Sequence, residues 1–320
     1  MSWEVYRLIY QAKAPMHVGY HKIGFIQRTR YYITGRNMWG AIAANLARSL
    51  EFDAMKTVQR SCKTPLEQHY ENIGISLLNK DILISYFYPT TNSEKPHPIL
   101  PRFEPTGLKY GEYPNEEFER LFIRSFGQTA IEPANNTAEE GSLHETEYIA
   151  PSVELNGDQK EVYFVGYIFM KGKINYQNKS VGFDEGDIKI KEAIRELFVG
   201  GERKYGFGRL VLSDKSKKIK DKNPCMFGNQ LILDNDKYVK VKIEKETPIP
   251  AHLDIEVKAC MKGDIEPIVG REWGEIKDSE GKSIIGPGQK VSGAKICWMP
   301  GSILLERKEF SLGSFGILTP

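Results

Sequence analysis

The sequence predicts an α+β protein whose residues 1–213 follow the ferredoxin-like (RRM-like) order βαββαβ, with insertions between elements. Two patterns lead to this prediction. Apolar and polar side chains alternate over residues 4–13, as in a half-buried strand, and apolar side chains recur at helical spacing over 37–50. Such a unit packs an antiparallel sheet against two helices, and a sheet face or the loops at one end remain for a ligand. Its other elements are expected as strands at 73–78, 82–88, 147–153, 162–170 and 209–213 and as an amphipathic helix at 187–198.

The length of 320 residues fits two domains. We expect the ferredoxin-like domain over 1–215 and a lysine-rich linker over 215–222. A smaller domain over 223–320 should be mostly β or a degenerate second ferredoxin-like unit. Six prolines between 89 and 117 predict a long extended insertion that projects from the core. Residues 14–35 are expected to be irregular, and Thr34 or Asn37 can cap the helix that follows.

Composition excludes several functional classes. The four cysteines are far apart and form no Cys-x-x-Cys pair, so no metal site is expected, and reduced thiols fit a cytoplasmic protein. No run of 18 apolar residues indicates a membrane helix, and residues 1–4 do not begin a signal peptide. No pattern points to a cofactor. We therefore expect no cofactor, no metal and no membrane partner.

Positive charge is concentrated in two stretches of a chain whose net charge is only +2. Residues 5–50 contain no Asp or Glu and seven cations. A second stretch, 202–222, contains eight cations against three acidic residues. Local excess of this kind is typical of a polyanion-binding surface. The seven N-terminal cations are Arg7, Lys13, Lys22, Arg28, Arg30, Arg36 and Arg48.

A glycine-rich loop over 199–209 is the strongest local signal. It is not a Walker loop, because the Gly-Lys-Ser/Thr ending is missing. It is expected to join the end of a helix to a strand, whereas a dinucleotide fingerprint joins a strand to a helix. Exposed glycine amides can cradle phosphates, and aromatic side chains can stack on bases or wedge the loop against the core. The alternative is a tight connection that needs small residues. The loop holds Gly200, Gly201, Gly206 and Gly208, the cations Arg203, Lys204 and Arg209, and the aromatic residues Tyr205 and Phe207.

Three segments together with this loop carry a resemblance to a known family. They are the turn at 14–19, the stretch from Gln27 to Ala43 with its Gly40-Ala41 pair, and the stretch 136–148. Each resembles a pattern of the RAMP superfamily, the repeat-associated proteins of CRISPR systems. The resemblance covers about 5–213 and nothing beyond Lys222. In two respects the chain departs from the family: the loop lies far from the C-terminus, and Thr34 stands where many relatives have Pro.

The resemblance implies a subunit of a CRISPR ribonucleoprotein in antiviral defence, and the best fit is the subunit that caps the 5′ handle of the guide RNA in type III effectors. The implied partners are guide RNA, other effector subunits and, through the 89–117 insertion, target nucleic acid. Phosphates would contact the cations and bases would stack on the aromatic residues. The candidate RNA-binding residues are His17, Tyr20, His21, Lys22, Arg28, Arg30, Tyr31, Arg36, Asn37, Gly200, Gly201, Arg203, Lys204, Tyr205, Gly206, Phe207, Gly208 and Arg209.

Catalysis is the main alternative. His17 or His21 could serve a metal-independent endoribonuclease that processes repeat RNA, because such chemistry needs a general base and a general acid. The position of the loop argues against this activity, since repeat-cleaving relatives usually carry the loop near the chain end. A third hypothesis is a structural subunit whose contacts are mainly with proteins. We expect a non-catalytic RNA-binding subunit.

Overall fold

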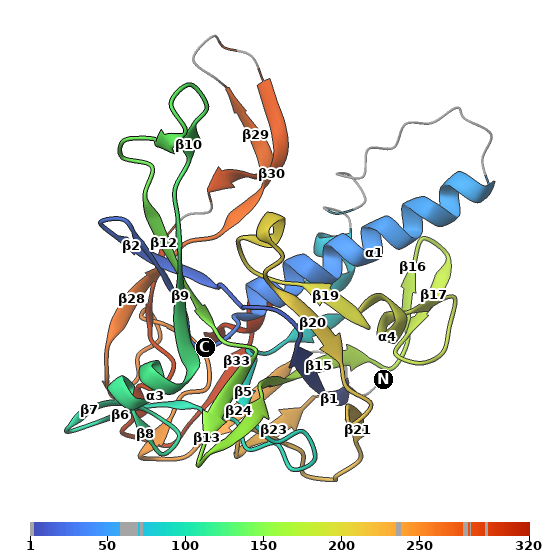
Figure 1. Cartoon of the computed structure of the whole chain (residues 1–320). Coiled ribbons are helices and arrows are strands. Elements are labelled where there is room, and N and C mark those ends of the chain that lie inside the picture. The colour runs from blue at the N-terminus through green and yellow to red at the C-terminus, as the bar shows by residue number, and fades with distance from the viewer. Residues whose placement is uncertain are drawn as a thin grey trace.

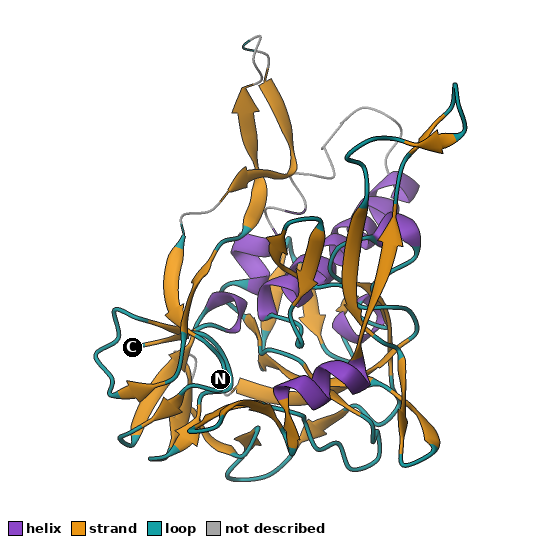
Figure 2. Cartoon of the chain, turned by 60° about the vertical axis from the view of Figure 1, so that its left-hand side comes forward, coloured by secondary structure: helices purple, strands orange, loops and turns teal. Residues whose placement is uncertain are grey.

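The computed structural model describes residues 3–57, 70, 73–234, 238–277, 281, 283–291 and 294–320, and it shows a mixed α and β fold rich in strands (Figures 1 and 2). A seven-stranded central sheet has the order β19-β20-β1-β15-β4; β21 also pairs with β1, and β5 with β15. Its strands are β1 (Trp3–Ala12), β4 (Ile82–Ile84), β5 (Tyr88–Thr90), β15 (Tyr163–Lys171), β19 (Glu196–Phe198), β20 (Arg209–Leu212) and β21 (Lys217–Ile219).

The strand predicted at 4–13 is confirmed, but it is buried on both faces rather than one. Strand β1 pairs antiparallel with β15 from Trp3–Lys171 to Gln11–Tyr163. Leu8 and Ile9 are both 0% exposed. Because successive side chains of a strand point to opposite faces, both faces of the central sheet are covered here.

One face packs against the helices. The helix predicted at 37–50 is confirmed as α1 (Gly35–Thr57), and Ile42 and Leu46 share a buried cluster with Leu8 of the sheet. The Thr34 hydroxyl accepts a hydrogen bond from the Asn37 amide at 3.4 Å, as expected for a cap. The other helical segments are η1 (Gly74–Leu78), α3 (Asn115–Phe122), α4 (Ile190–Ala193), η2 (Arg203–Tyr205) and η3 (Ser314–Gly316).

The opposite face packs against the C-terminal part, whose described elements are strands and the short helix η3. Val5 and Phe169 of the central sheet lie in one buried cluster with Val241, Leu253 and Phe310. The two parts of the chain therefore share a core. An eight-stranded sheet contains, in spatial order, β22 (Cys225–Met226), β23 (Asn229–Leu233), β24 (Val239–Ile243), β33 (Lys308–Leu312), β34 (Leu318–Thr319), β26 (Leu253–Asp254), β31 (Lys295–Trp298) and β28 (Ile265–Ile268).

Three predicted elements were wrong. Only Ile190–Ala193 is helical within 187–198, because Leu197 lies in strand β19 and pairs with Leu210 of β20. Residues 14–35 contain the hairpin β2 (Gly19–Ile23) and β3 (Ile26–Thr29), and the strand predicted at 73–78 is helical. The 73–78 stretch is a short, mostly apolar run, and such a run shows no periodicity by which a strand could be told from a helix.

The proline-rich segment 89–117 is folded rather than extended. It forms a three-stranded sheet of β6 (Pro101–Glu104), β7 (Gly107–Tyr110) and β8 (Tyr113–Pro114). The Phe103 amide donates to the Gly301 carbonyl at 2.9 Å, and Tyr110 stacks on Phe118 of α3 with ring centroids 4.6 Å apart. Pairing and aromatic packing therefore hold this segment against the rest of the chain.

Two hairpins project from the body (Figure 1). One consists of β9 (Ile123–Gln128) and β12 (His144–Ile149), with β10 (Ile131–Glu132) and β11 (Thr137–Ala138) beyond them; the other pairs β29 (Arg271–Lys277) with β30 (Ser283–Val291). Among the described residues, no helix is long and apolar enough to cross a membrane. The remaining strands are β13 (Ser152–Leu155), β14 (Asp158–Glu161), β16 (Ile174–Tyr176), β17 (Lys179–Gly182), β18 (Ile188–Lys189), β25 (Thr247–Pro248), β27 (Met261–Lys262) and β32 (Ile303–Leu304).

Candidate nucleic-acid interface

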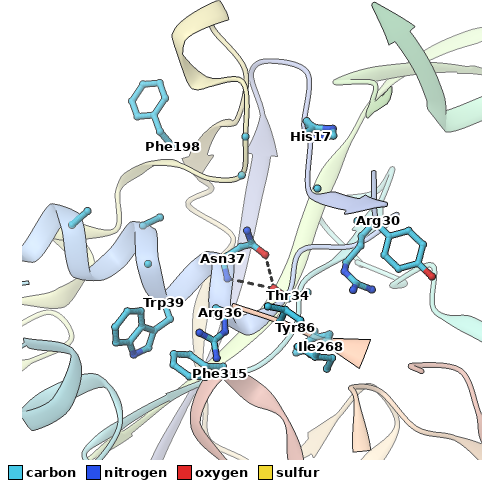
Figure 3. A pocket seen from close by; sticks show the side chains of 18 of the residues that line it. His17, Arg30, Thr34, Arg36, Asn37, Trp39, Tyr86, Phe198, Ile268 and Phe315 are labelled. Atoms are coloured by element: carbon cyan, nitrogen blue, oxygen red, sulfur yellow. Dashed lines mark hydrogen bonds between the residues drawn. The ribbon is translucent and has the colours of Figure 1, made fainter. Parts of the chain in front are cut away.

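A cleft of about 1360 Å³ lies where α1, the turn before β2, the loop between β19 and β20, and two C-terminal segments meet (Figure 3). The C-terminal segments are 267–269 and 314–317. The cleft brings together residues that are up to 300 positions apart in the sequence. From the predicted set it contains His17, Tyr20, His21, Arg30, Arg36, Asn37, Gly200, Gly201 and Arg203.

The N-terminal turn and the glycine-rich loop are docked on each other. The Gly201 amide donates to the His17 carbonyl at 2.9 Å, and the Gly208 amide donates to the Pro15 carbonyl at 2.8 Å. Gly200 has a φ of +84°, and a Cβ there would lie 2.1 Å from the His17 carbonyl oxygen. The loop connects two strands rather than a helix and a strand. Its glycines allow close backbone approach, and the amides of Gly201, Gly206 and Gly208 are already bonded to carbonyls of the chain, so these three do not cradle a phosphate.

His17 is nearly buried, with 5% of its surface exposed. Its Nδ1 lies 2.7 Å from the carbonyl oxygen of Glu147. Since a carbonyl only accepts, Nδ1 carries the hydrogen, and Nε2 is the ring nitrogen that could act as a base. His21 is exposed, with its ring 3.6 Å from the ring of Tyr20. His21 is therefore more accessible to a ligand than His17.

The charged lining of the cleft is strongly positive. Its charged side chains are Arg30, Arg36, Arg48, Arg203 and Glu202. Two of these cations, at positions 48 and 203, are exposed and come from two different elements, α1 and the glycine-rich loop. A polyanion that enters the cleft would pass between them.

Arg36 is held at the start of α1 by the C-terminal turn. Its guanidinium lies 3.9 Å above the ring of Phe315, a contact visible in Figure 3. Phe315 has a φ of +63°, and its carbonyl packs so closely on Gly35 that a Cβ there would lie 2.2 Å away. This cation is thus positioned by packing, and strain at a non-glycine residue is typical of sites that need a fixed geometry.

Arg30 lines the cleft, and its guanidinium is engaged in a buried polar network. Its Nη1 lies 2.6 Å from Glu266 Oε1, and its guanidinium lies 4.4 Å above the Tyr20 ring. His252 Nε2 contacts the same carboxylate, and Tyr86 Oη lies 2.6 Å from His252 Nδ1. The network joins the N-terminal and C-terminal parts of the chain.

The protonation of this network follows from its burial. Burial alone raises the pKa of Glu266, but hydrogen bonds from His252 and Arg30 outweigh it and lower that pKa to about 2. Burial lowers the pKa of His252, against the effect of its bond to Glu266. A neutral His252 can donate from Nε2 to the carboxylate and accept the Tyr86 hydroxyl at Nδ1.

Other predicted residues of the N-terminal stretch lie outside the cleft. Lys22 is exposed on β2. Arg28 forms ion pairs with Glu119 at 3.3 Å and Glu147 at 2.7 Å. Tyr31 is 7% exposed, and its hydroxyl donates to Glu119 at 2.5 Å. The side chains of Arg28 and Tyr31 are therefore structural, and the Tyr31 ring does not offer a face on which a base could stack.

The outer part of the glycine-rich loop also lies apart from the cleft. Phe207 is 6% exposed and packs edge-on against Tyr148, so it wedges the loop against the core. Arg209 pairs with Glu196 at 2.6 Å. Tyr205 is 63% exposed and remains available for stacking. Lys204 is exposed beside it, and Gly206 and Gly208 both have a φ of +84°.

Several cleft residues were missed by the sequence analysis. Phe198 is 44% exposed at the mouth, where a helix had been predicted to bury it. Trp39 is anchored by its indole nitrogen, which donates to Asn79 Oδ1 at 3.0 Å. The residues from the C-terminal part reach the cleft only through tertiary packing. The missed lining residues include Trp39, Arg48, Phe198, His252, Ile268 and Phe315.

No protein-family model matches the chain, and no curated protein matches its sequence. Similar solved structures are chains of the Type III-B Cmr-beta complex. One, bound to cognate target RNA, is 13% identical with a TM-score of 0.44, covering 93% of this chain and 86% of that one. Another, with target RNA and AMPPnP, is 13% identical at 0.42, covering 93% and 85%. A third, in the apo state, is 11% identical at 0.35, covering 68% and 98%. These TM-scores do not establish a common fold.

Two Gly→Ala substitutions in the loop, compared with each other, test whether the loop is docked on the N-terminal turn. Gly200→Ala should lower the free energy of unfolding by about 3 kcal/mol, because it adds a clash with the His17 carbonyl to the strain of a positive φ. Gly206→Ala has the same φ of +84° and no atom within 4 Å, so it should cost about 1 kcal/mol. Urea denaturation measures both. Equal losses would mean that the turn and the loop are not docked as described.

The buried network makes a prediction about acid stability. Glu266→Gln should cost about 3 kcal/mol, because it leaves the buried Arg30 without its counter-charge. The wild-type pKa lies below the usual 4.5, so this carboxylate stabilises the fold fully above about pH 4.5, and the contribution is lost as pH falls toward 2. The variant should therefore lose less stability than wild type between pH 5 and pH 3, measured by denaturation at each pH.

An exposed ion pair gives the matched control. Glu196→Gln removes the partner of Arg209, and both side chains are about half exposed. It should cost about 0.5 kcal/mol. A similar cost for both substitutions would contradict the assignment of Glu266 to a buried, fully engaged network.

Proposed function

We propose that this chain is an RNA-binding subunit of a CRISPR ribonucleoprotein of the type III kind, and that its RNA lies in the cleft. One observation carries the proposal: besides Arg30, which is paired with Glu266, the cleft is lined by Arg36, Arg48 and Arg203 against one glutamate, in a chain whose net charge is +2. Cations that release counterions from phosphates supply most of the non-specific affinity for nucleic acid. The positive charge is thus concentrated in a cleft that also has space for a strand of RNA.

The contacts between the resembling motifs support the same proposal. The turn at 14–19 and the loop at 199–209 lie far apart in sequence, and each resembles a RAMP motif. In the structure they bond to each other at the edge of the cleft, through Gly201 and Gly208. Membership of the RAMP superfamily would explain why these motifs occur together. The turn at 14–19 and the loop at 199–209 therefore form one surface rather than two separate ones.

The central sheet fits a ferredoxin-like core, which is also a proposal. Its order β20-β1-β15-β4 is antiparallel throughout, with α1 between β1 and β4 in sequence and α4 between β15 and β20. RNA-recognition domains of this class stack bases on the open sheet face. Here that face is covered by the C-terminal part, so RNA would bind the loops and α1 at one end. In domain terms, 1–215 would provide the RNA-binding unit and 223–320 its β-rich support.

The role in the complex is proposed from the resemblance. The cleft would hold the 5′ handle of the guide RNA, with phosphates near Arg48 and Arg203 and a base on the exposed ring of Tyr205. Other effector subunits would be its protein partners, and target nucleic acid would contact the assembled complex. Such a protein would act in cytoplasmic antiviral defence. The endoribonuclease remains the second candidate, because His17 and His21 both line the cleft.

RNA binding by the purified chain tests the proposal. In a native gel with labelled CRISPR-repeat RNA and chelator, the complex should weaken steeply as salt rises. The double variant Arg48→Ala/Arg203→Ala should bind about tenfold more weakly and lower the slope of log affinity against log salt by about 1.4, since each single-strand phosphate contact contributes about 0.7.

Two exposed lysines outside the cleft supply the control. Lys179→Ala/Lys222→Ala removes the same number of charges and should leave the affinity nearly unchanged. An equal effect of both double variants would show that the cleft is not the binding surface. A denaturing gel of the same samples should show intact RNA. A discrete cut that disappears in His21→Ala would instead establish the endoribonuclease.

A further inference from the structure

An aromatic side chain is exposed at the mouth of the cleft, on the last residue of β19. Phe198 is 44% exposed, whereas Leu197 before it is fully buried. Because neighbouring side chains of a strand point to opposite faces, Leu197 packs into the core and Phe198 faces away from it. Figure 3 shows the ring of Phe198 standing clear of α1. The core therefore does not use this ring, and a ligand in the cleft can reach it.

The helix wall of the same cleft carries short side chains. Gly40, Ala44 and Ala47 line the cleft, and their spacing places them on one face of α1 over successive turns. None of these side chains extends beyond a β-carbon, so a flat group can come close to the helix backbone. The short side chains provide space, while the ring of Phe198 and the nearby cations decide which group can use it.

Helix α1 and strand β19 are tied to each other by side-chain hydrogen bonds. The Asn45 Nδ2 atom donates to the carbonyl oxygen of Ala193 at 3.0 Å and to that of Glu196 at 2.8 Å. Directly after Phe198, the Val199 amide donates to the Gly208 carbonyl at 2.9 Å. The backbone on both sides of Phe198 is therefore held in place, and a ligand would bind there without a large ordering cost.

Exposed cations belong to the same part of the cleft. Arg48 follows Ala44 by one turn of α1, and Arg203 lies in the loop that follows β19; both are exposed and line the cleft. Proteins that hold single-stranded nucleic acid combine such cations, which bind phosphates, with aromatic rings on which bases stack. The cations favour a nucleotide over an apolar protein side chain as the ligand of the ring.

We infer that Phe198 stacks on one unpaired nucleobase, which enters the cleft beside α1. The inference rests on the proposed function, which places RNA in this cleft, and it adds that the RNA is single-stranded at this position. A base suits the position better than a phosphate, because the ring of Phe198 and the methyl groups of Ala44 and Ala47 donate no hydrogen bonds. A base that remains paired and stacked inside a duplex does not offer its face to an aromatic ring.

Substitutions at Phe198 test the inference on single-stranded CRISPR-repeat RNA in a native gel. Phe198→Leu keeps an apolar side chain without the ring and should weaken binding about tenfold, as the loss of one base–aromatic stack does. The slope of log affinity against log salt should not change, because no charge is removed. Phe198→Tyr should bind like wild type, and Ala44→Leu, which fills the space beside the ring, should bind about as weakly as Phe198→Leu. The control Tyr238→Ala removes an exposed aromatic residue outside the cleft and should have no effect.

A series of RNAs, each with one abasic nucleotide, completes the test. At one position the missing base should weaken wild type about tenfold and leave Phe198→Leu unchanged, because that variant has already lost the stack. A complementary strand annealed across this position should abolish the difference between wild type and Phe198→Leu.

The outcomes separate this inference from the proposed function. If every abasic RNA weakened wild type and Phe198→Leu equally, no base would lie on this ring, and the inference would be wrong. The same holds if Phe198→Leu bound like wild type while Arg48→Ala/Arg203→Ala bound weakly, and the cleft would then remain the RNA site. If wild type showed no salt-sensitive binding, the proposed function and the inference would both fall.

Discussion

The pairing of β1 with β15 is the constraint on which the rest of the molecule depends. These strands contribute apolar side chains to both faces, so each face must be covered: one by α1 and the other by the C-terminal sheet. Neither face is then left for a ligand. What remains is the end of the sheet where the helix begins and the β19–β20 loop turns. The position of the cleft therefore follows from burial.

The cations of this structure fall into two groups, those paired with acidic residues and those exposed in the cleft. Some cations of the N-terminal stretch are neutralised by acidic residues distant in sequence, as Arg28 is by Glu119 and Arg30 by Glu266. These pairs hold the fold together. The cations that stay exposed in the cleft, such as Arg48 and Arg203, are the ones that a phosphate can reach. Counting charges along the sequence does not separate these two groups, because the counter-charges come from other elements.

The elements with strong periodicity were predictable, and those decided by tertiary packing were not. Strand β1, helix α1 with its Thr34 cap and the mostly β C-terminal part followed from pattern. The 187–198 stretch had helical spacing, but its last residues, Glu196–Phe198, pair with β20, and only Ile190–Ala193 are helical. The association of the N-terminal turn with the glycine-rich loop was not predicted, because the two segments are about 185 residues apart and bond through backbone groups that no sequence pattern marks. The contribution of Phe315 to the cleft had no local signal, since its strained turn is packed against α1.

The order in which the chain is made sets a condition on how it can fold. Strand β1 is synthesised before all of its partners, β15, β20 and β21, which end at residues 171, 212 and 219. Contacts of such sequence separation form slowly. The second face of the sheet is covered only when strands up to Leu318 exist. A growing chain therefore exposes an apolar sheet until the strands up to Leu318 have been made, and a ribosome pause or truncation before that point would leave an aggregation-prone intermediate.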